Sequence, residues 1–235
     1  NVNQLNDSTY ILSILPENKP INDSPYYAFK IWSSSSKKVL LKFQYPKNFK
    51  HRYIPKIKSN GIWKTADSLN FKFDDNLSSL TIKINDNPKI ISGQELHTSS
   101  IVYKWVDQLI SGRESYIKFK EIGKTKLNRP FKVLDIYKGV PKNKPVIVIL
   151  TRQHPPEVTG YFAFKVFLKT ILKENKLSSI FLDKYRILAF PLMNPDGVDL
   201  GHWRHNAGGV DTNRDWSFYH QPEIKTTVQY ITKVL

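Results

Sequence analysis

The sequence predicts an antiparallel β-sandwich over residues 1–105, followed by the first part of an α/β domain with a mixed sheet over residues 106–235. Two patterns lead to this prediction. Near the N-terminus, apolar and polar residues alternate with a period of two between turn signals, as in a sandwich of short strands. Further along, an apolar strand, a helix and a second strand follow one another, which is the order of a βαβ unit.

Composition limits the classes of protein and the kinds of site to consider. Of the 235 residues, 40% are hydrophobic, which can support packed cores, and none is cysteine, so a bound metal must be held by His, Asp or Glu. The net charge of +16 is spread along the chain without a dense basic run, which suits a lysine-rich surface or attraction of acidic substrates better than nucleic-acid binding. No apolar run is long enough to span a bilayer. The lack of cysteine fits a cytosolic or a periplasmic protein, and the start at Asn1 suggests that a preceding segment has been removed.

The strands expected in the first domain follow one another at short intervals. Residues 26–32 are aromatic and β-branched, and residues 39–45 alternate between apolar and polar side chains. Asn60-Gly61 is a turn signal directly before the next strand. A further alternating segment contains the apolar residues Phe71, Phe73, Leu80, Ile82 and Ile84.

A short helix is expected to link the two domains. It covers residues 99–110, and Ile101, Trp105 and Leu109 are expected on one face. Two alternating segments, 116–122 and 131–137, then indicate the first strands of the second domain.

The βαβ unit follows these strands. The apolar run at 146–150 suits a buried parallel strand, and a helix over about residues 157–172 joins it to a strand at 186–193, which we expect to run parallel to the first. A last helix begins near Pro222, and its expected apolar stripe consists of Ile224, Val228, Ile231 and Leu235. Four strands are few for a covered α/β sheet, so we expect the sequence to stop within its second domain.

The first motif suited to chemistry is His154-Pro155-Pro156-Glu157, directly after the apolar strand. Open α/β sheets bind their ligands at the carboxyl ends of the parallel strands. Imidazole and carboxylate suit Zn²⁺, which in catalytic sites takes three protein ligands and keeps one position open. The two prolines restrict the connection, and Pro156 suits the first position of a helix. Taken alone, such a pair is more often a polar surface loop than a metal site.

Two further motifs follow the next strand. Asn194-Pro195-Asp196-Gly197 has the composition of a tight turn, and that is the expected role of Asp196. The run over residues 201–216 brings two arginines and two asparagines to the same sheet edge. Arginine binds carboxylates through two parallel hydrogen bonds, so this run suits a peptide's terminal carboxylate beside a metal, with surface ion pairs as the alternative.

In this order and spacing, His-x-x-Glu, Asn-Pro-Asp-Gly, Trp-Arg and Asp-x-Asn-Arg resemble the zinc carboxypeptidases of the carboxypeptidase A superfamily, over roughly residues 115–235. Segments 26–31, 51–55 and 61–63 resemble the β-sandwich that precedes the catalytic domain in the cytosolic carboxypeptidase subfamily. The resemblance implies an α/β zinc carboxypeptidase domain that uses Zn²⁺ and removes C-terminal residues from peptides or proteins, with a preference for acidic ones.

The resemblance also implies roles at the metal. His154 and Glu157 match two of the three zinc ligands, and Asp211 matches the carboxylate that receives the other N–H of the first histidine. In the implied mechanism, Zn²⁺ lowers the pKa of its water to about 7, and a glutamate moves a proton to the leaving amine.

Three residues match the substrate-binding positions of the family. Arg204 matches the arginine that stabilises the oxyanion, and Asn213 and Arg214 match the pair that binds the terminal carboxylate. At Pro156 some family members have an arginine for extended substrates, so that contact is absent here.

The third zinc ligand and the general-base glutamate are expected beyond Leu235. His202, His205 and His220 are the histidines nearest to the matched motifs, but none occupies the position of the ligand. The chain by itself is therefore expected to be inactive, as part of an active parent protein.

Two alternatives remain open at this point. The first is a noncatalytic carboxypeptidase-like binding module, which differs from the enzyme only in residues that the motifs do not include. The second is a nucleic-acid-binding protein that uses the positive charge, and the order of the motifs argues against it. We expect neither nucleic acid nor membrane as a partner, and the sequence leaves the oligomeric state open.

Overall fold

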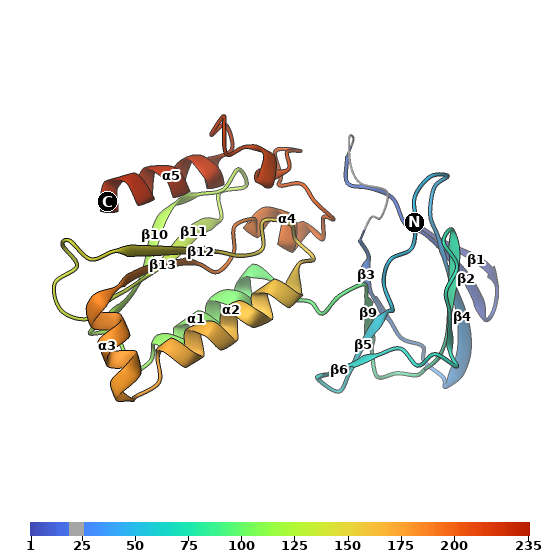
Figure 1. Ribbon diagram of the computed structural model, residues 1–235. Helices are drawn as coiled ribbons and strands as arrows, with labels where there is room; N and C mark the ends of the chain where they lie inside the picture. Colours follow the sequence, from blue (N-terminus) through green and yellow to red (C-terminus); the bar gives the residue numbers. More distant parts are fainter. Residues whose placement is uncertain (19–25) are drawn as a thin grey trace. The chain divides into compact units, whose positions relative to one another are not determined.

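The computed structural model describes residues 1–18 and 26–235 and divides into two compact units (Figure 1). Unit 1 comprises Asn1–Leu96 and Gly201–Trp203, and unit 2 comprises His97–Leu200 and Arg204–Leu235. The boundary expected at residues 105/106 falls inside a helix that lies wholly in unit 2.

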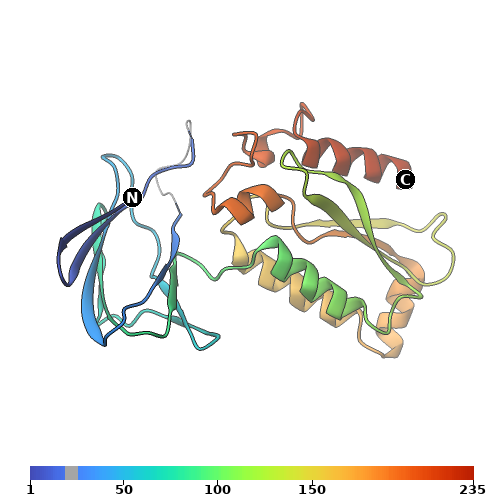
Figure 2. The ribbon, with the colours of Figure 1, turned by 180° about the vertical axis from the view of Figure 1, so that it is seen from behind.

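Unit 1 is built from two sheets (Figure 2). The five-stranded sheet has the spatial order β1 (Val2–Asn6), β2 (Thr9–Ser13), β4 (Lys37–Gln44), β8 (Leu77–Ile84) and β7 (Phe71–Lys72). The four-stranded sheet has the order β3 (Ala28–Ile31), β9 (Lys89–Ser92), β5 (Lys56–Ser59) and β6 (Ile62–Thr65). One hydrophobic core takes side chains from both sheets, among them Leu41, Phe43, Leu80 and Ile91.

The hairpin between β5 and β6 confirms the turn signal in the sequence. Ser59 pairs with Ile62 across the turn, and Asn60 and Gly61 have φ angles of 50° and 80°. Positive φ at both central residues is what a two-residue hairpin turn of type I′ requires.

Two features of unit 1 differ from the expectation. Strand β2 pairs with β4 in parallel, so the unit is not wholly antiparallel. Parallel neighbours need a crossover connection, and alternation within a strand does not reveal one. Strand β1 was not predicted, because all five of its residues are exposed and no apolar face marks it.

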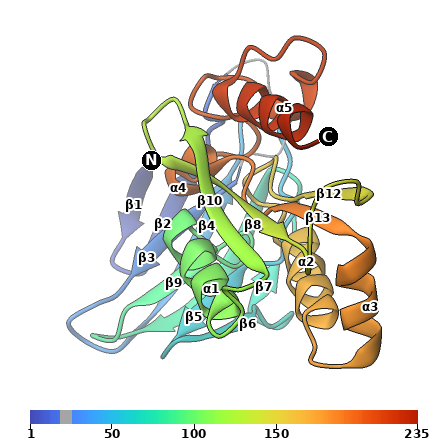
Figure 3. The ribbon, with the colours of Figure 1, turned by 90° about the vertical axis from the view of Figure 1, so that its left-hand side faces the viewer.

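Unit 2 contains a sheet with the order β10 (Ile117–Lys124), β11 (Pro130–Ile136), β13 (Arg186–Phe190) and β12 (Val146–Leu150) (Figure 3). Strands β12 and β13 are adjacent and parallel, which confirms the predicted pair, and the other neighbours are antiparallel. Within the described residues β12 is the last strand of the sheet, and it is half-buried, with Val148 37% exposed, where a buried strand was expected.

Helices cover both faces of this sheet. Helices α1 (Ser99–Ile110) and α2 (Val158–Ile171) pack on one face against a core that includes Leu134 and Ile187. Helix α5 (Pro222–Val234) packs on the other, where the core includes Val133 and Leu188. Successive residues of one strand thus supply the two cores, as the alternation of a β-strand dictates. None of the helices in the described part of the chain is long and apolar enough to cross a membrane.

The faces expected for two helices are confirmed only in part: Leu109 and Ile224 are buried, and Trp105 and Ile231 pack against the cores. Helix α1 buries Val102, Val106 and Leu109, whereas Ile101 is 42% exposed. Residues at positions i, i+4 and i+7 share a helix face, and Val102, Val106 and Leu109 have this spacing. The spacing of Ile101, Trp105 and Leu109 is equally helical, so the sequence alone does not decide which set is buried. Helix α5 buries Glu223, Ile224 and Thr227, and Leu235 is 83% exposed.

Candidate active site

The turn after β12 presents His154 at the carboxyl end of the strand. Arg152 has a φ of 60°, a left-handed conformation that costs a residue with a side chain about 1–2 kcal/mol. Its buried guanidinium donates two hydrogen bonds to the carbonyl of Pro155, from Nε at 2.9 Å and from Nη2 at 2.5 Å. Arg152 therefore fixes the turn that carries the histidine.

His154 lies between two carboxylates. Its Nδ1 is 2.7 Å from Glu157 Oε1, and its Nε2 is 2.9 Å from Asp211 Oδ1. The side chain of His154 is 15% exposed and that of Asp211 is 9% exposed, so the pair is shielded, whereas Glu157 is 56% exposed. The structure thus brings together three of the residues that the sequence analysis named.

The charges in this group stabilise one another. The hydrogen bond that His154 Nδ1 donates to Glu157 is the main cause that raises the pKa of His154, and it outweighs the effect of burial. Burial alone would raise the pKa of Glu157 and of Asp211, but the hydrogen bonds with His154 lower both below their ordinary values. Without a metal, the site therefore favours two ionised carboxylates around a protonated imidazole.

Asp211 also links His154 to Arg204. Arg204 Nε donates to Asp211 Oδ2 at 2.7 Å, and the backbone N–H of Asn213 donates to Asp211 Oδ1 at 2.9 Å. The positive charge of Arg204 also contributes to the lowered pKa of Glu157, so the guanidinium acts on the same group. Asn213 and Arg214 are exposed within the short 3-10 turn Thr212–Arg214.

Gln153 is a residue of the site that the sequence analysis missed. Its carbonyl accepts hydrogen bonds from the side chains of Asn194 and Thr212, both at 3.2 Å. Its side chain accepts from Trp216 Nε1 at 2.7 Å and donates to Asn213 Oδ1 at 3.4 Å. Gln153 therefore contacts residues of both other motifs while lying next to His154. The sequence feature that could have identified it is its position, as a polar residue at the end of a strand beside a candidate metal ligand.

The Asn-Pro-Asp-Gly motif begins a short helix, α4 (Pro195–Leu200), and does not form an isolated turn. Asn194 Oδ1 accepts from the N–H of Gly197 at 2.9 Å and caps it. A Cβ at Gly197 would lie 2.5 Å from the carbonyl oxygen of His205, so the close approach of the following loop requires glycine.

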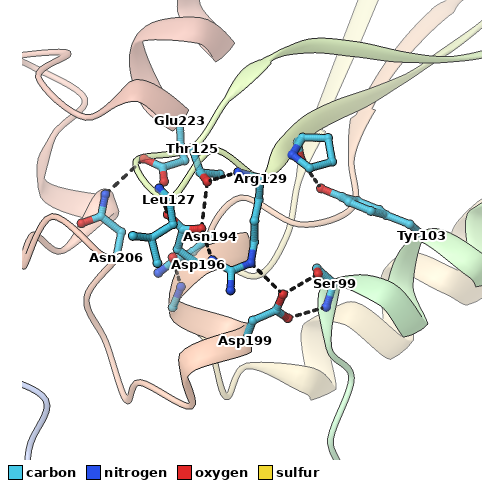
Figure 4. Close-up of polar contacts among 12 residues, drawn as sticks. Ser99, Tyr103, Thr125, Leu127, Arg129, Asn194, Asp196, Asp199, Asn206 and Glu223 are labelled. Atoms are coloured by element: carbon cyan, nitrogen blue, oxygen red, sulfur yellow. Dashed lines mark hydrogen bonds and ion pairs between the residues drawn. The ribbon is translucent and has the colours of Figure 1, made fainter.

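Asp196 and Asp199 fasten α4 to the loop between β10 and β11 (Figure 4). Asp196 is fully buried and accepts from Thr125 Oγ1 at 2.8 Å, from the N–H of Leu127 at 3.0 Å and from Arg129 Nη1 at 2.8 Å. Arg129 Nε also donates to Asp199 Oδ2 at 3.1 Å. The expected role of Asp196 as a plain turn residue was therefore wrong, because its carboxylate holds a loop about seventy residues away.

Two atoms that could ligate a metal ion, His154 Nδ1 and Glu157 Oε1, face one another 2.7 Å apart. Asp211 accepts the Nε2 proton of His154, and Glu157 accepts the Nδ1 proton; loss of the Nδ1 proton would turn its lone pair toward a metal ion held between His154 and Glu157. Within residues 1–18 and 26–235, however, no group of three His, Asp or Glu side chains is arranged to hold a metal. His154 and Glu157 therefore fit two of the three protein ligands of a catalytic zinc site.

With this geometry established, comparison with known families shows the class of protein. Residues 102–231, more than half of the chain, match the zinc carboxypeptidase family. The chain belongs to that family, and its relatives and structural neighbours are metallocarboxypeptidases, which are hydrolases and metalloproteases. The family implies zinc.

Among the relatives are the cytosolic carboxypeptidases. Cytosolic carboxypeptidase 2 of Xenopus tropicalis is 36% identical over 73 residues, which are 31% of this chain and 8% of the relative. Cytosolic carboxypeptidase 6 of Mus musculus is 27% identical over 139 residues, 55% of this chain and 25% of the relative. The chain thus spans a quarter or less of the length of these curated relatives.

Solved structures of metallo-carboxypeptidases share the fold along the whole chain. The enzyme from Burkholderia cenocepacia has a TM-score of 0.85 and 16% identity, with 100% of this chain and 64% of that chain covered. That from Pseudomonas aeruginosa, solved in complex with (2-guanidinoethylmercapto)succinic acid, has a TM-score of 0.80 and 17% identity, with 98% and 63% covered. The chain therefore has a carboxypeptidase-like α/β fold.

Proposed function

We propose that the full-length protein is a zinc-dependent carboxypeptidase that removes residues from the free carboxyl ends of peptides or proteins. The observation that supports this most strongly is the group formed by His154, Glu157, Asp211 and Arg204 at the carboxyl end of β12. Membership of the zinc carboxypeptidase family supports the same activity. The names of the relatives support a cytoplasmic location.

In this proposal His154 and Glu157 hold Zn²⁺ together with a third ligand that the described residues do not supply. When bound there, zinc polarises the scissile carbonyl and lowers the pKa of its water to about 7. Asp211 fixes the tautomer and the orientation of His154 through the Nε2 hydrogen bond. Arg204, oriented by the same Asp211, supplies positive charge for the oxyanion of the tetrahedral intermediate.

Asn213 and Arg214 are proposed to bind the terminal carboxylate of the substrate. Both are exposed, and they follow directly on Asp211, whose carboxylate accepts from the backbone N–H of Asn213. An arginine offers a rigid fork of donors for a carboxylate, and an asparagine adds an amide. We further propose a preference for acidic C-terminal residues, which the net charge of +16 and the resemblance to the cytosolic subfamily support.

The test compares release of the last residue from peptides that end in Glu, Lys or Phe, each with a free or an amidated C-terminus. Amidation should lower kcat/KM by about 100-fold, the scale of one or two hydrogen bonds to a charged group. Arg214→Ala should remove most of that difference, and Arg214→Lys, which keeps the charge without the fork, should lie between. Equal rates on free and amidated peptides would exclude the carboxypeptidase activity, and faster release of Lys than of Glu would exclude the acidic preference alone.

A second candidate is a noncatalytic binding module with the same fold. It shares the exposed Asn213 and Arg214 with the proposed enzyme. Such a module would bind a peptide with a free carboxyl end through Arg214 and would not hydrolyse it. Tight binding of C-terminal peptides without any release of product by the full-length protein distinguishes the module from the enzyme.

A further inference from the structure

Three residues from late in the chain belong to unit 1. They are Gly201–Trp203, whereas their neighbours Leu200 and Arg204 belong to unit 2. Gly201 directly follows helix α4 and has a φ of 72°, the left-handed conformation in which a glycine commonly ends a helix. The chain therefore passes into unit 1 at this turn and returns to unit 2 with Arg204.

Trp203 is held in unit 1 by the packing of its ring. The ring forms an edge-to-face pair with that of Tyr53, with the centroids 5.9 Å apart and the planes at 72°, and the guanidinium of Arg52 lies 5.4 Å from the centroid of the Trp203 ring. Both arrangements are favourable for an indole. The indole Nε1 is buried and has no hydrogen-bond partner among the described residues, so ring contacts and not a hydrogen bond fix Trp203.

Tyr53, on which Trp203 packs, has a fixed place in the core of unit 1. It is 8% exposed, and its ring packs against those of Tyr26 and Tyr27 at centroid distances of 6.2 Å and 6.3 Å. A Cβ at Gly93 would lie 2.8 Å from Tyr53 Cδ2, so the ring occupies space that only a glycine leaves open. Trp203 is therefore anchored on a side chain that has little freedom to move.

The next residue, Arg204, takes part in the candidate active site. Its Nε donates to Asp211 Oδ2 at 2.7 Å, and the other oxygen of Asp211 contacts His154. The Cα atoms of Trp203 and Arg204 are joined by one planar peptide and lie about 3.8 Å apart. An anchored Trp203 therefore restricts where the backbone of Arg204 can lie, and the long arginine side chain starts from a fixed point.

We propose that Trp203, anchored in unit 1, is a positioning residue for Arg204. The inference rests on the proposed function, in which Arg204 supplies charge for the oxyanion. A preorganised charge stabilises a transition state without reorganisation, and a displacement of about 1 Å can lower the rate strongly. Loss of the Trp203 ring should therefore reduce turnover more than substrate binding, for which Asn213 and Arg214 are proposed.

The experiment measures kcat and KM of the full-length zinc-loaded protein on a peptide with a free C-terminus. Trp203→Ala removes the ring, and Trp203→Phe keeps an aromatic ring without the unpartnered nitrogen. The matched control is Trp63→Ala, which removes another tryptophan of unit 1 that lies beside a cation, Lys58. Trp203→Ala is also combined with Arg204→Ala, and Trp203→Leu takes its place if Trp203→Ala does not fold.

Trp203→Ala should lower kcat about tenfold and change KM less than about twofold, a smaller loss than the 100-fold or so expected when an oxyanion donor is removed outright. Trp203→Phe and Trp63→Ala should stay within about threefold of the wild type. In the Arg204→Ala background, Trp203→Ala should cost less than about twofold, because both substitutions remove the same contribution. Equal losses in Trp203→Ala and Trp63→Ala, or fully additive losses in the double variant, would overturn the proposal.

Amide hydrogen exchange tests the anchor without any turnover. Exchange in the segment 204–211 should be at least about tenfold faster in Trp203→Ala than in the wild type, and it should be unchanged in Trp63→Ala. Unchanged exchange in Trp203→Ala would overturn the proposal. A wild-type protein that releases no product would contradict the proposed function alone, and the exchange result would then decide whether Trp203 holds Arg204 in place.

Discussion

Glu223 is a buried carboxylic acid in the first turn of α5. It is fully buried, and only one of its oxygens, Oε2, has a partner among the described residues, the side-chain amide of Asn206 at 3.1 Å. Burial raises the pKa of Glu223, and the nearby carboxylates of Asp196 and Asp215 raise it further. Ionised Glu223 is therefore a local cost to the folded state.

We expect Glu223→Gln to stabilise the protein at high pH. Because the pKa of Glu223 is raised by folding, the wild-type protein keeps its full stability below the unfolded pKa and loses part of it as the pH rises through the folded pKa. Glutamine keeps the shape and an acceptor for Asn206 without the charge, so the variant should gain about 1 kcal/mol at pH 8 and nothing near pH 4.

Urea unfolding at pH 4, 6 and 8 measures this difference. Glu174→Gln, at an exposed position, is the control and should show no such trend. A variant that is less stable than the wild type at pH 8, or whose advantage grows toward low pH, would contradict the account of Glu223.

At the scale of secondary structure, Arg129 joins α4 to the loop between β10 and β11. Its side chain is 30% exposed, whereas the side chain of Asp196 that it contacts is fully buried. Removing one partner of a buried pair leaves a charge without compensation, which costs more than the pair contributes. Because Asn194 at the start of α4 holds the carbonyl of Gln153, the same contact supports the turn with His154.

Arg129→Met should destabilise the protein by about 2–4 kcal/mol, somewhat less than for a wholly buried pair. The control is Lys124→Met, which breaks the exposed pair of Lys124 with Glu121, 51% and 44% exposed, and should cost less than about 1 kcal/mol. Chemical denaturation measures both. Adding Asp196→Asn to Arg129→Met should recover part of the loss, and an equal cost of the two single substitutions would refute the role of Arg129.

The sequence predicted those features that depend on neighbours in the chain. The strand–helix junction placed His154 and Glu157 at a sheet edge, and the structure brings them within 2.7 Å. The hairpin at Asn60-Gly61 and the parallel pair of β12 and β13 were likewise predictable from local patterns. In each of these cases the signal and the structure lie within one or two adjacent elements.

Features that depend on distant partners could not be read from the sequence. Asp196 has its partners in the 125–129 loop, and no local pattern links the two segments. Helix α3 (Lys176–Lys184) was missed because its side chains are mostly polar or exposed, although Asn175 caps it through the N–H of Ser178. The burial of helix faces depends on which elements cover them, so Ile101 and Leu235 were placed wrongly.

At the scale of the whole molecule, the two units differ in how charge is distributed. The strands of unit 1 contain lysine and no acidic residue, whereas strands β10 and β11 of unit 2 also contain Glu121 and Asp135. In unit 2 carboxylates gather at the carboxyl end of β12, where two of them surround His154.

The central claim is that His154 and Glu157 hold the metal, and zinc binding to the full-length protein tests it directly. His154→Ala should weaken zinc affinity at least tenfold. Substitution of a residue that merely orients a metal ligand already lowers metal affinity about 10–100-fold. His220→Ala is the control and should bind zinc like the wild type, because His220 is exposed and contacts neither residue of the pair. An unchanged affinity in His154→Ala, or an equal loss in His220→Ala, would contradict the claim.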